Sequence, residues 1–224
     1  MVSSLLATIA TAAVLATHAT GSRVADVPDL VARPLHASVV LHAAPGGRAL
    51  VRVGPRSVFG GPVAFGVVGA RGKWLRVTSE ALPNEHYGWV ERGRDVSVRA
   101  DRWALHAFLA RHVLIVLHDG HVARSIPVAI GTASSPTPTG RFAVAEKLPG
   151  SGFASVYGCC ILGLTAHQPH PPAGWSTSRA YFIAIHGGSG IGAAVSAGCL
   201  HASEADLRFL MRWIPLGTAI RISR

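Results

Sequence analysis

Short stretches in which apolar and polar residues alternate, separated by turns rich in glycine and proline, run through residues 33–99. Alternation with a period of two places every second side chain on one face of a β-strand, so each stretch predicts a half-buried strand. Several such strands at close spacing predict a small β-barrel. The predicted strands lie at residues 38–42, 49–53, 63–68, 73–78 and 87–91.

Residues 100–111 carry a different pattern. Asp101 stands at a position suited to a helix cap, and apolar residues follow it with the spacing of one helical face. This pattern predicts a short helix that connects two domains. The apolar residues on the predicted face are Ala104, Leu105, Phe108 and Leu109.

The remaining residues, 112–224, predict a second domain that is mostly β. An apolar run at residues 113–117 precedes Asp119 and Gly120, a pair that favours a tight hairpin turn. Pro127 in the following strand predicts an edge position, because proline cannot donate to a strand ladder. Further strands are predicted at residues 141–145, 157–164, 181–185 and 218–222.

A helix is predicted near the end of this second domain. Ser203 and Asp206 form a capping pattern ahead of apolar positions at helical spacing, and Pro215 ends the run. The predicted fold class is therefore mainly β, with a small barrel followed by a mostly β domain that contains one helix.

The N-terminal residues 4–17 form an alanine-rich apolar run without a charged residue. The run suits the hydrophobic part of an export signal and is too short for a membrane span of about 20 residues. We expect residues 1–25 to be an export signal, with an uncleaved membrane anchor as the alternative. The expected location is the periplasm or cell wall.

The chain is strongly basic, with 21 Lys and Arg against 11 Asp and Glu and a formal net charge of +10. These basic residues are scattered and form no basic arm, so binding to nucleic acid is not predicted. Attraction to an anionic wall polymer or membrane surface fits export better.

The strongest candidate chemistry lies in residues 181–203. His186 ends an apolar alternation, and Cys199 follows Gly198 shortly before the predicted helix. A cysteine attacks as the thiolate, which a nearby base or a helix N-terminus favours, and backbone N–H groups around Cys199 could stabilise an oxyanion. On these residues alone, a buried structural cysteine and a core histidine remain an alternative.

The other two of the three cysteines, Cys159 and Cys160, are adjacent. A bridge between neighbours would be strained, so the sequence does not predict a disulfide framework. We expect this pair to be structural.

Two motifs resemble a known family. The sequence IHG, a glycine-rich interval and then SAGCL resemble the signature of the L,D-transpeptidases with a YkuD-type catalytic domain. Upstream, SPTPTGRF at residues 135–142 resembles the family's TP-x-G-x-F segment, and the resemblance covers residues 112–222. It implies the formation of peptidoglycan cross-links through a cysteine acyl-enzyme. It also implies stem peptides as substrates, carbapenem-type β-lactams as inhibitors, and no metal or other cofactor.

The resemblance implies a role for several residues. Cys199 would be the acylated nucleophile, His186 its base, and the Gly187 carbonyl the group that orients the imidazole. Ser196 and Gly198 match positions that shape the pocket.

This chain departs from the family pattern near the cysteine. Ala197 stands where many members carry a second histidine, and His201 stands where many carry arginine or asparagine. The interval of 13 positions between His186 and Cys199 is short for the family. His201 is therefore a candidate substrate-binding residue whose neutral form cannot replace a guanidinium.

The first domain also carries a resemblance. The segments KWLRV and YGWVER resemble the end of a bacterial SH3-like domain, which implies an SH3-like barrel over residues 33–99. Such a barrel would bind or position the cell wall, and an interdomain spacer is the alternative. Trp74, Tyr87 and Trp89 could stack on a ligand or pack in the core.

Other functions remain open. If water resolves the acyl-enzyme, the same site is an L,D-carboxypeptidase, and a non-catalytic wall-binding protein would need only the first domain. A cysteine peptidase of the NlpC/P60 kind places its cysteine before its histidine, which is the reverse of the order found here. A metal-dependent hydrolase could use His118 with His121, or His167 with His170, although no third ligand is evident nearby.

Overall fold

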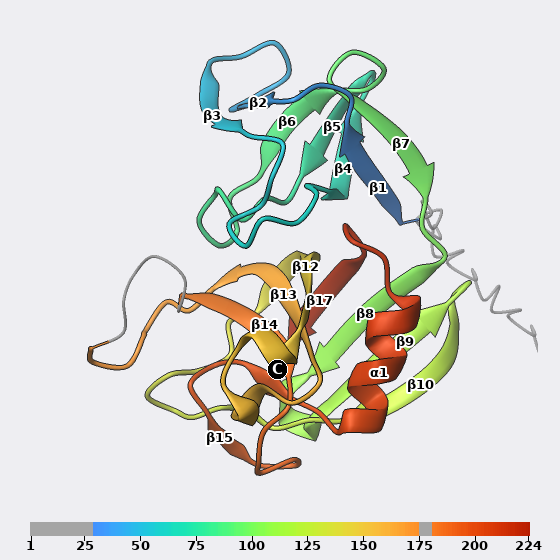
Figure 1. Ribbon diagram of the computed structural model, residues 1–224. Helices are drawn as coiled ribbons and strands as arrows, with labels where there is room; N and C mark the ends of the chain where they lie inside the picture. The colour runs from blue at the N-terminus through green and yellow to red at the C-terminus, as the bar shows by residue number, and fades with distance from the viewer. Residues whose placement is uncertain (1–28, 175–180) are drawn as a thin grey trace, which may run out of the picture.

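The computed structural model describes residues 29–174 and 181–224, and the fold is mainly β, as predicted. The expected export signal lies outside the described residues. Figure 1 shows two β bodies, one above the other, joined where β7 (Val96–Ala100) leads into β8 (Trp103–Phe108). Within these described ranges, no helix is long and apolar enough to cross a membrane.

The first body is a sheet of seven strands in the order β3-β2-β6-β5-β4-β1-β7, and all neighbouring strands are antiparallel. Burial alternates along β5, where Leu75 and Val77 face the core. The five strands predicted for this body are confirmed, and β1 and β7 are two strands that the prediction missed. The SH3-like assignment stays a prediction. The other strands are β1 (Leu30–Pro34), β2 (Val39–His42), β3 (Ala49–Val53), β4 (Phe65–Arg71), β5 (Trp74–Val77) and β6 (Gly88–Glu91).

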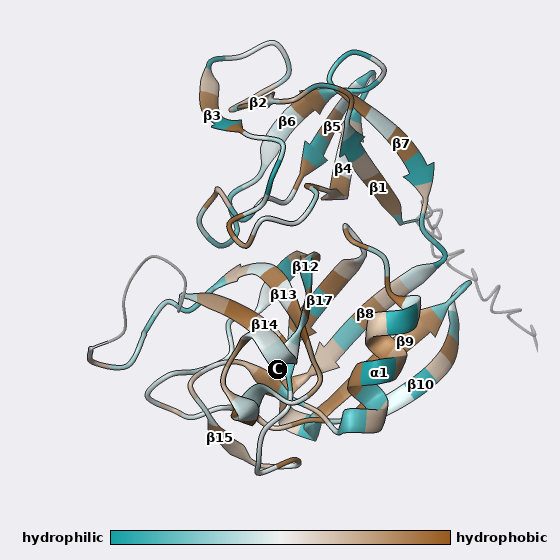
Figure 2. Cartoon of the chain, viewed as in Figure 1, coloured by the Kyte–Doolittle hydropathy of each residue, from teal (hydrophilic) through white to brown (hydrophobic). Residues whose placement is uncertain are grey.

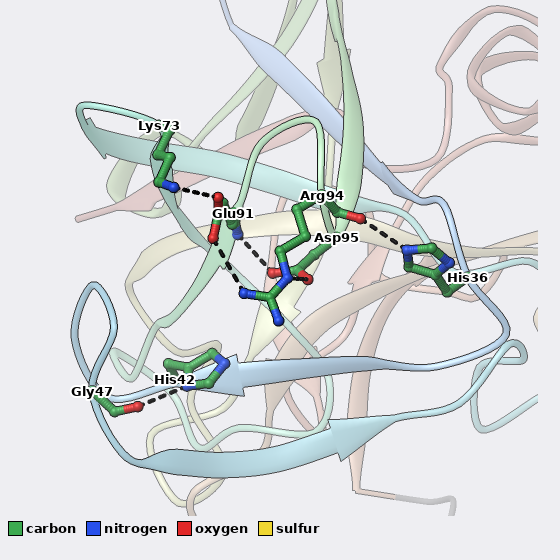
Figure 3. Close-up of polar contacts among 7 residues, drawn as sticks. All are labelled: His36, His42, Gly47, Lys73, Glu91, Arg94 and Asp95. Atoms are coloured by element: carbon green, nitrogen blue, oxygen red, sulfur yellow. Dashed lines mark hydrogen bonds and ion pairs between the residues drawn. The ribbon is translucent and has the colours of Figure 1, made fainter.

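A polar cluster around Glu91 stabilises the turn between β6 and β7 (Figure 3). The Glu91 carboxylate lies 2.6 Å from Lys73 Nζ and 3.5 Å from an Arg94 guanidinium nitrogen. The Glu91 backbone N–H donates to the Asp95 carboxylate over 2.9 Å, and His36 Nε2 donates to the Arg94 carbonyl over 2.9 Å. The hydrogen bond from Lys73 is the main cause that lowers the pKa of Glu91. The cluster therefore ties this turn to the start of β5.

The prediction of a connecting helix at residues 100–111 is wrong. The segment forms strand β8 followed by a short 3-10 turn at Leu109–Arg111. β8 pairs with β9 (Val113–His118) on one side and with β17 (Ala219–Ser223) on the other, and Leu105 and Ala107 are buried on one face. The spacing of the apolar residues fits both a helix and a strand. The segment forms a strand because both of its edges pair with strands of the second sheet. The second body therefore begins at β8 and not near residue 112.

The second body contains a sheet of eight strands in the order β10-β9-β8-β17-β12-β13-β14-β16, and a pair formed by β11 and β15. The hairpin between β9 and β10 turns at Asp119 and Gly120, both with positive φ, as predicted. Pro127 lies on β10 at the sheet edge, also as predicted. The strands are β9 (Val113–His118), β10 (His121–Pro127), β11 (Ile130–Gly131), β12 (Gly140–Pro149), β13 (Cys160–His167), β14 (Phe182–His186), β15 (Ala194–Ser196), β16 (Leu200–His201) and β17 (Ala219–Ser223). Short 3-10 turns at Gly150–Gly152 and Ser155–Tyr157 lie between β12 and β13.

The predicted C-terminal helix is confirmed as α1 (Glu204–Trp213). The Ser203 side chain caps it by accepting the Asp206 N–H over 3.2 Å. Figure 2 shows brown and teal bands alternating along α1, which is the pattern of an amphipathic helix. Its apolar side packs against β13, and Leu207 and Leu210 are fully buried in the core of the second body.

The adjacent cysteines form a disulfide, Cys159–Cys160, which the sequence did not predict. The bridge lies at the start of β13 and follows the turn at Gly158, which has a φ of 71°. The Gly150 N–H donates to the Cys159 carbonyl over 2.7 Å. Cys199 is the free cysteine of the chain.

Candidate active site

Two neighbouring parallel strands bring the histidine and the cysteine together. β14 pairs with β16 so that Ile185 lies opposite Leu200 and His186 opposite His201. Cys199 directly precedes β16, and its Sγ accepts the backbone N–H of Ala184 on β14 over 3.4 Å. The short interval in sequence therefore corresponds to a connection between adjacent strands.

His186 and Cys199 line one cleft of about 730 Å³. Most of its other lining residues are apolar or aromatic, and most come from the second body. They are Phe59, Leu148, Gly152, Phe153, Val156, Tyr157, Ile161, Gly163, Phe182, Ala184, Ala197 and His201. A cleft with apolar walls and a few polar groups is the usual form of a small-molecule or peptide site.

The His186 imidazole is buried, with 5% of its surface exposed. Its Nδ1 lies 2.5 Å from the Gly187 carbonyl oxygen, which can only accept, so Nδ1 carries the proton and Nε2 is left as the basic nitrogen. Burial lowers the pKa of His186 to about 4; the Gly187 hydrogen bond opposes this shift and the nearby His201 adds to it. The imidazole is therefore neutral at pH 7 and can accept a proton.

Burial is also the main cause of the shifted pKa of the Cys199 thiol. It raises the pKa of Cys199 to about 11, and the hydrogen bond from the Ala184 N–H opposes this shift only in part. The approach to a helix N-terminus was expected to be a modest aid to the thiolate, and desolvation of the sulfur outweighs any such aid. The resting pair is thus a neutral thiol and a neutral imidazole.

The turn before Cys199 is held by hydrogen bonds that are buried or partly buried. The Ser196 hydroxyl accepts the Gly198 N–H over 3.0 Å and donates to the Cys199 carbonyl over 2.6 Å. The Thr137 hydroxyl donates to the Gly198 carbonyl over 2.8 Å, and Gln168 Nε2 donates to the Ala197 carbonyl over 2.5 Å. Ser196 and Gly198 therefore shape the site through the backbone that carries the thiol.

Gly198 is required in this turn for two reasons. Its φ of 118° is one that other residues rarely adopt. A Cβ at this position would lie 2.1 Å from Gln168 Nε2. Any side chain here would displace Gln168 from the turn.

Sequence reasoning missed the roles of Thr137 and Gln168 around this turn. Thr137 lies in the SPTPTGRF segment, so the second motif contained a signal that could have placed it near the cysteine. Gln168 follows β13 and carries no comparable signal.

His201 lies beside the base. The two imidazole ring centroids are 4.9 Å apart, and His201 Nδ1 donates to the Ser189 carbonyl over 2.9 Å. A Cβ on Gly188 would lie 2.6 Å from His201 Nδ1, so the glycine makes room for this ring. His201 therefore borders the cleft, as its candidate binding role requires.

One histidine of each pair considered for a metal site packs against an aromatic ring. His118 stacks on Trp103 with ring centroids 4.3 Å apart, and His167 packs against Phe182 at 4.8 Å. Among residues 29–174 and 181–224, no group of three or more His, Cys, Asp or Glu side chains could hold a metal ion.

The raised pKa of Cys199 predicts an unusual alkylation profile. We expect iodoacetamide to label Cys199 slowly at neutral pH and about tenfold faster for each unit of pH up to about 11, because only the thiolate reacts. Intact-mass time courses between about pH 6 and about pH 10 would measure this. Cys199→Ala should take no label, since the other two cysteines are bridged. A rate that levels off near the ordinary thiol pKa of about 8.5 would contradict the prediction.

The comparison with known proteins identifies the enzyme class. Residues 102–222, more than half of the 224-residue chain, match the family model of the L,D-transpeptidase catalytic domain, YkuD. The protein is therefore an enzyme of the L,D-transpeptidase class, and the chain belongs to the YkuD family. Over 162 residues the chain is 25% identical to a Bacillus licheniformis protein that bears the name "Putative L,D-transpeptidase YkuD". This match covers 66% of the chain and 88% of that protein.

Three solved structures of L,D-transpeptidases are similar to this chain. One from Mycobacterium smegmatis has 16% identity and a TM-score of 0.45, with 88% of this chain and 100% of that chain covered. L,D-transpeptidase 1 from Mycobacterium tuberculosis has 21% identity and a TM-score of 0.38, with 62% of this chain and 77% of that chain covered. One from Stackebrandtia nassauensis has 16% identity and a TM-score of 0.40; 55% of this chain is covered, and the match spans 56% of that chain.

Proposed function

We propose that the protein forms peptidoglycan cross-links through an acyl-enzyme on Cys199, with His186 as the base. One observation carries this proposal. The thiol and an imidazole with its basic Nε2 line one cleft, and the Gly187 carbonyl fixes the imidazole tautomer. The family match supplies the reaction class, and stem peptides are the substrates that this class implies.

The proposed acylation joins proton transfer to attack. As Cys199 Sγ bonds to the carbonyl carbon of the donor stem peptide, His186 Nε2 takes the thiol proton. It then gives that proton to the departing amine as the carbon–nitrogen bond breaks and the terminal D-residue leaves. A free thiolate need not accumulate, which suits a thiol whose pKa is raised to about 11. Because the Gly198 N–H already donates to Ser196, we assign stabilisation of the oxyanion to the Cys199 N–H.

The acceptor completes the cycle. The amine of a second stem peptide attacks the thioester carbonyl, loses a proton to His186 Nε2 and becomes the new amide. The sulfur leaves and is protonated again by His186. If water attacks instead, the product is a shortened stem peptide and the enzyme acts as an L,D-carboxypeptidase.

The two outcomes are separated by product analysis. We expect incubation with a carbapenem to add one inhibitor mass to the wild-type protein, because the β-lactam carbonyl replaces the donor carbonyl. With a tetrapeptide donor and an amine acceptor, we expect a cross-linked product by mass spectrometry. Hydrolysed donor alone would favour the carboxypeptidase, and a folded, reduced protein with no carbapenem adduct and no turnover would refute the proposal.

We further propose that residues 1–25 direct export, with an uncleaved anchor as the alternative, and that the first body is an SH3-like module acting at the cell wall. The net charge of +10 supports attraction to an anionic wall polymer. Cell fractionation with mass analysis of the mature N-terminus tests export and cleavage together. A full-length protein found in the cytoplasm would contradict this proposal.

A further inference from the structure

The loop between β12 and β13 lies against the proposed base. The Tyr157 ring meets the His186 imidazole edge-on, with the ring centroids 4.6 Å apart. The Tyr157 carbonyl accepts the Gly187 N–H over 2.8 Å, and the Gly187 carbonyl in turn accepts the Nδ1 proton of His186. Gly187 is therefore bonded to the loop through its N–H and to the base through its carbonyl.

The turn at Gly158 touches Gly187 directly. Gly158 has a φ of 71°, and a Cβ on it would lie 3.3 Å from Gly187 Cα. A Cβ on Gly187 would lie 2.9 Å from the Gly158 nitrogen. Because the two backbones are in contact without side chains between them, a displacement of this turn also displaces Gly187.

The disulfide follows this turn and joins it to β13. Cys160 is buried in the core of the second body and pairs with Pro149 in the sheet. Cys159 is partly exposed; its N–H donates to the Glu204 carboxylate over 2.9 Å, and its carbonyl accepts the Gly150 N–H over 2.7 Å. Two thiol sulfurs cannot stay at the bonded distance of about 2 Å, so one of them must move when the bridge opens. Since Cys160 is fixed in the sheet, Cys159 moves and takes the turn with it.

We propose that the Cys159–Cys160 bridge is a thiol–disulfide exchange site that positions His186, so that acylation is fast only while the bridge is closed. Opening the bridge moves the turn, weakens the hydrogen bond between Tyr157 and Gly187, and leaves the imidazole less well oriented. A displacement of about 1 Å can cost a catalytic group up to about 10²-fold in rate. This inference rests on the proposed function, since it regulates that same site.

The exchange takes a dithiol reductant from the surroundings. Cys159 is the more exposed of the two residues, so a thiolate of the reductant attacks Cys159 Sγ, and Cys160 leaves as a thiolate that takes up a proton. The second thiolate of the reductant then attacks the mixed disulfide, releases the Cys159 thiolate to be protonated in turn, and closes the reductant's own disulfide. The protein pair gains two electrons and two protons, and a small disulfide oxidant reverses the reaction.

Dithiothreitol tests the proposal on the full chain. The protein is reduced, freed of reductant under nitrogen and incubated with a carbapenem, while intact mass reports both the two hydrogen atoms gained by the pair and the adduct. We expect the reduced protein to be acylated about tenfold more slowly than the oxidised protein, and re-oxidation with oxidised glutathione to restore the rate. A bridge that stays closed in the folded protein, or a reduced protein acylated at the original rate, overturns the inference.

Two variants serve as references. The bridge cannot form in the double variant Cys159→Ser with Cys160→Ala, so we expect the slow rate with and without dithiothreitol, and thermal unfolding checks its fold. Ser151→Ala shortens an exposed side chain of the same loop that does not line the cleft, and it should keep both the wild-type rate and the wild-type response to reduction. A folded double variant acylated at the wild-type rate contradicts the proposal.

The pH profile separates positioning of the base from a general loosening of the fold. The pKa of the Cys199 thiol is raised to about 11, so hydroxide takes over from His186 as the pH rises. The deficit of the double variant should therefore shrink towards pH 11, whereas a loosened fold would slow acylation at every pH. A deficit that stays constant with pH overturns the role in positioning His186. A protein without carbapenem adduct in either redox state overturns the proposed function itself, whereas adducts that form at equal rates in both states overturn only this inference.

Discussion

Replacing Cys199 by serine is expected to lower the rate of donor acylation by at least about 10³-fold at neutral pH. A serine hydroxyl is a weaker nucleophile than a thiol and has a higher pKa. His186 is too weak a base to deprotonate it readily, because burial lowers the pKa of His186 to about 4. The serine oxygen can still accept the Ala184 N–H that Cys199 Sγ accepts, so the fold should persist. Acyl-enzyme formation measured by intact mass, with thermal unfolding as a check of folding, tests this expectation.

The control for this prediction lies in the same part of the chain. Val195 has half of its side chain exposed and does not line the cleft, so Val195→Ala should keep the wild-type acylation rate. A folded Cys199→Ser protein that is acylated at the wild-type rate would show that another group is the nucleophile. Cys159 and Cys160 are bridged and offer no free thiol to take its place.

The fold was predictable wherever the pattern in sequence has one interpretation. Ser203 and Asp206 define the start of α1, and Asp119 with Gly120 defines a hairpin, because each signal acts through local hydrogen bonds or backbone angles. Residues 100–111 satisfy both a helical and a strand period, and only the pairing of β8 with β9 and β17 decides between them. That pairing joins segments distant in sequence, which local patterns do not report.

Part of the candidate site was likewise predictable from the sequence, and part of it was not. The resemblance of short motifs to the family pointed to His186, Cys199 and the Gly187 carbonyl, and the pairing of β14 with β16 brings these groups to one place in the structure. The raised pKa of Cys199 was not predictable, since it depends on burial by the whole cleft. Phe59 was also missed, because it reaches the cleft from another body and carries no motif.

Replacing His186 by asparagine is expected to slow acylation by about 10²-fold to about 10⁴-fold at pH 7. An asparagine amide can donate to the Gly187 carbonyl as Nδ1 does now, but it cannot accept the thiol proton. A thiol with a pKa of about 11 is ionised in about one molecule in 10⁴ at pH 7, so without a base few molecules can attack. The loss should therefore shrink as the pH rises towards 11, since hydroxide then removes the proton.

The pH dependence separates a base from a packing residue. In the wild type, His186 stays neutral until the pH falls to about 4, because burial lowers its pKa below the ordinary value of 6.5. The wild-type acylation rate should therefore fall only as the pH approaches 4, whereas the rate of His186→Asn should rise with pH throughout. His121→Ala removes an exposed histidine outside the cleft and should keep the wild-type profile. A His186→Asn deficit that stays constant with pH would mean that His186 supports the cleft without taking the proton, and the base would have to be sought in His201, the neighbouring imidazole.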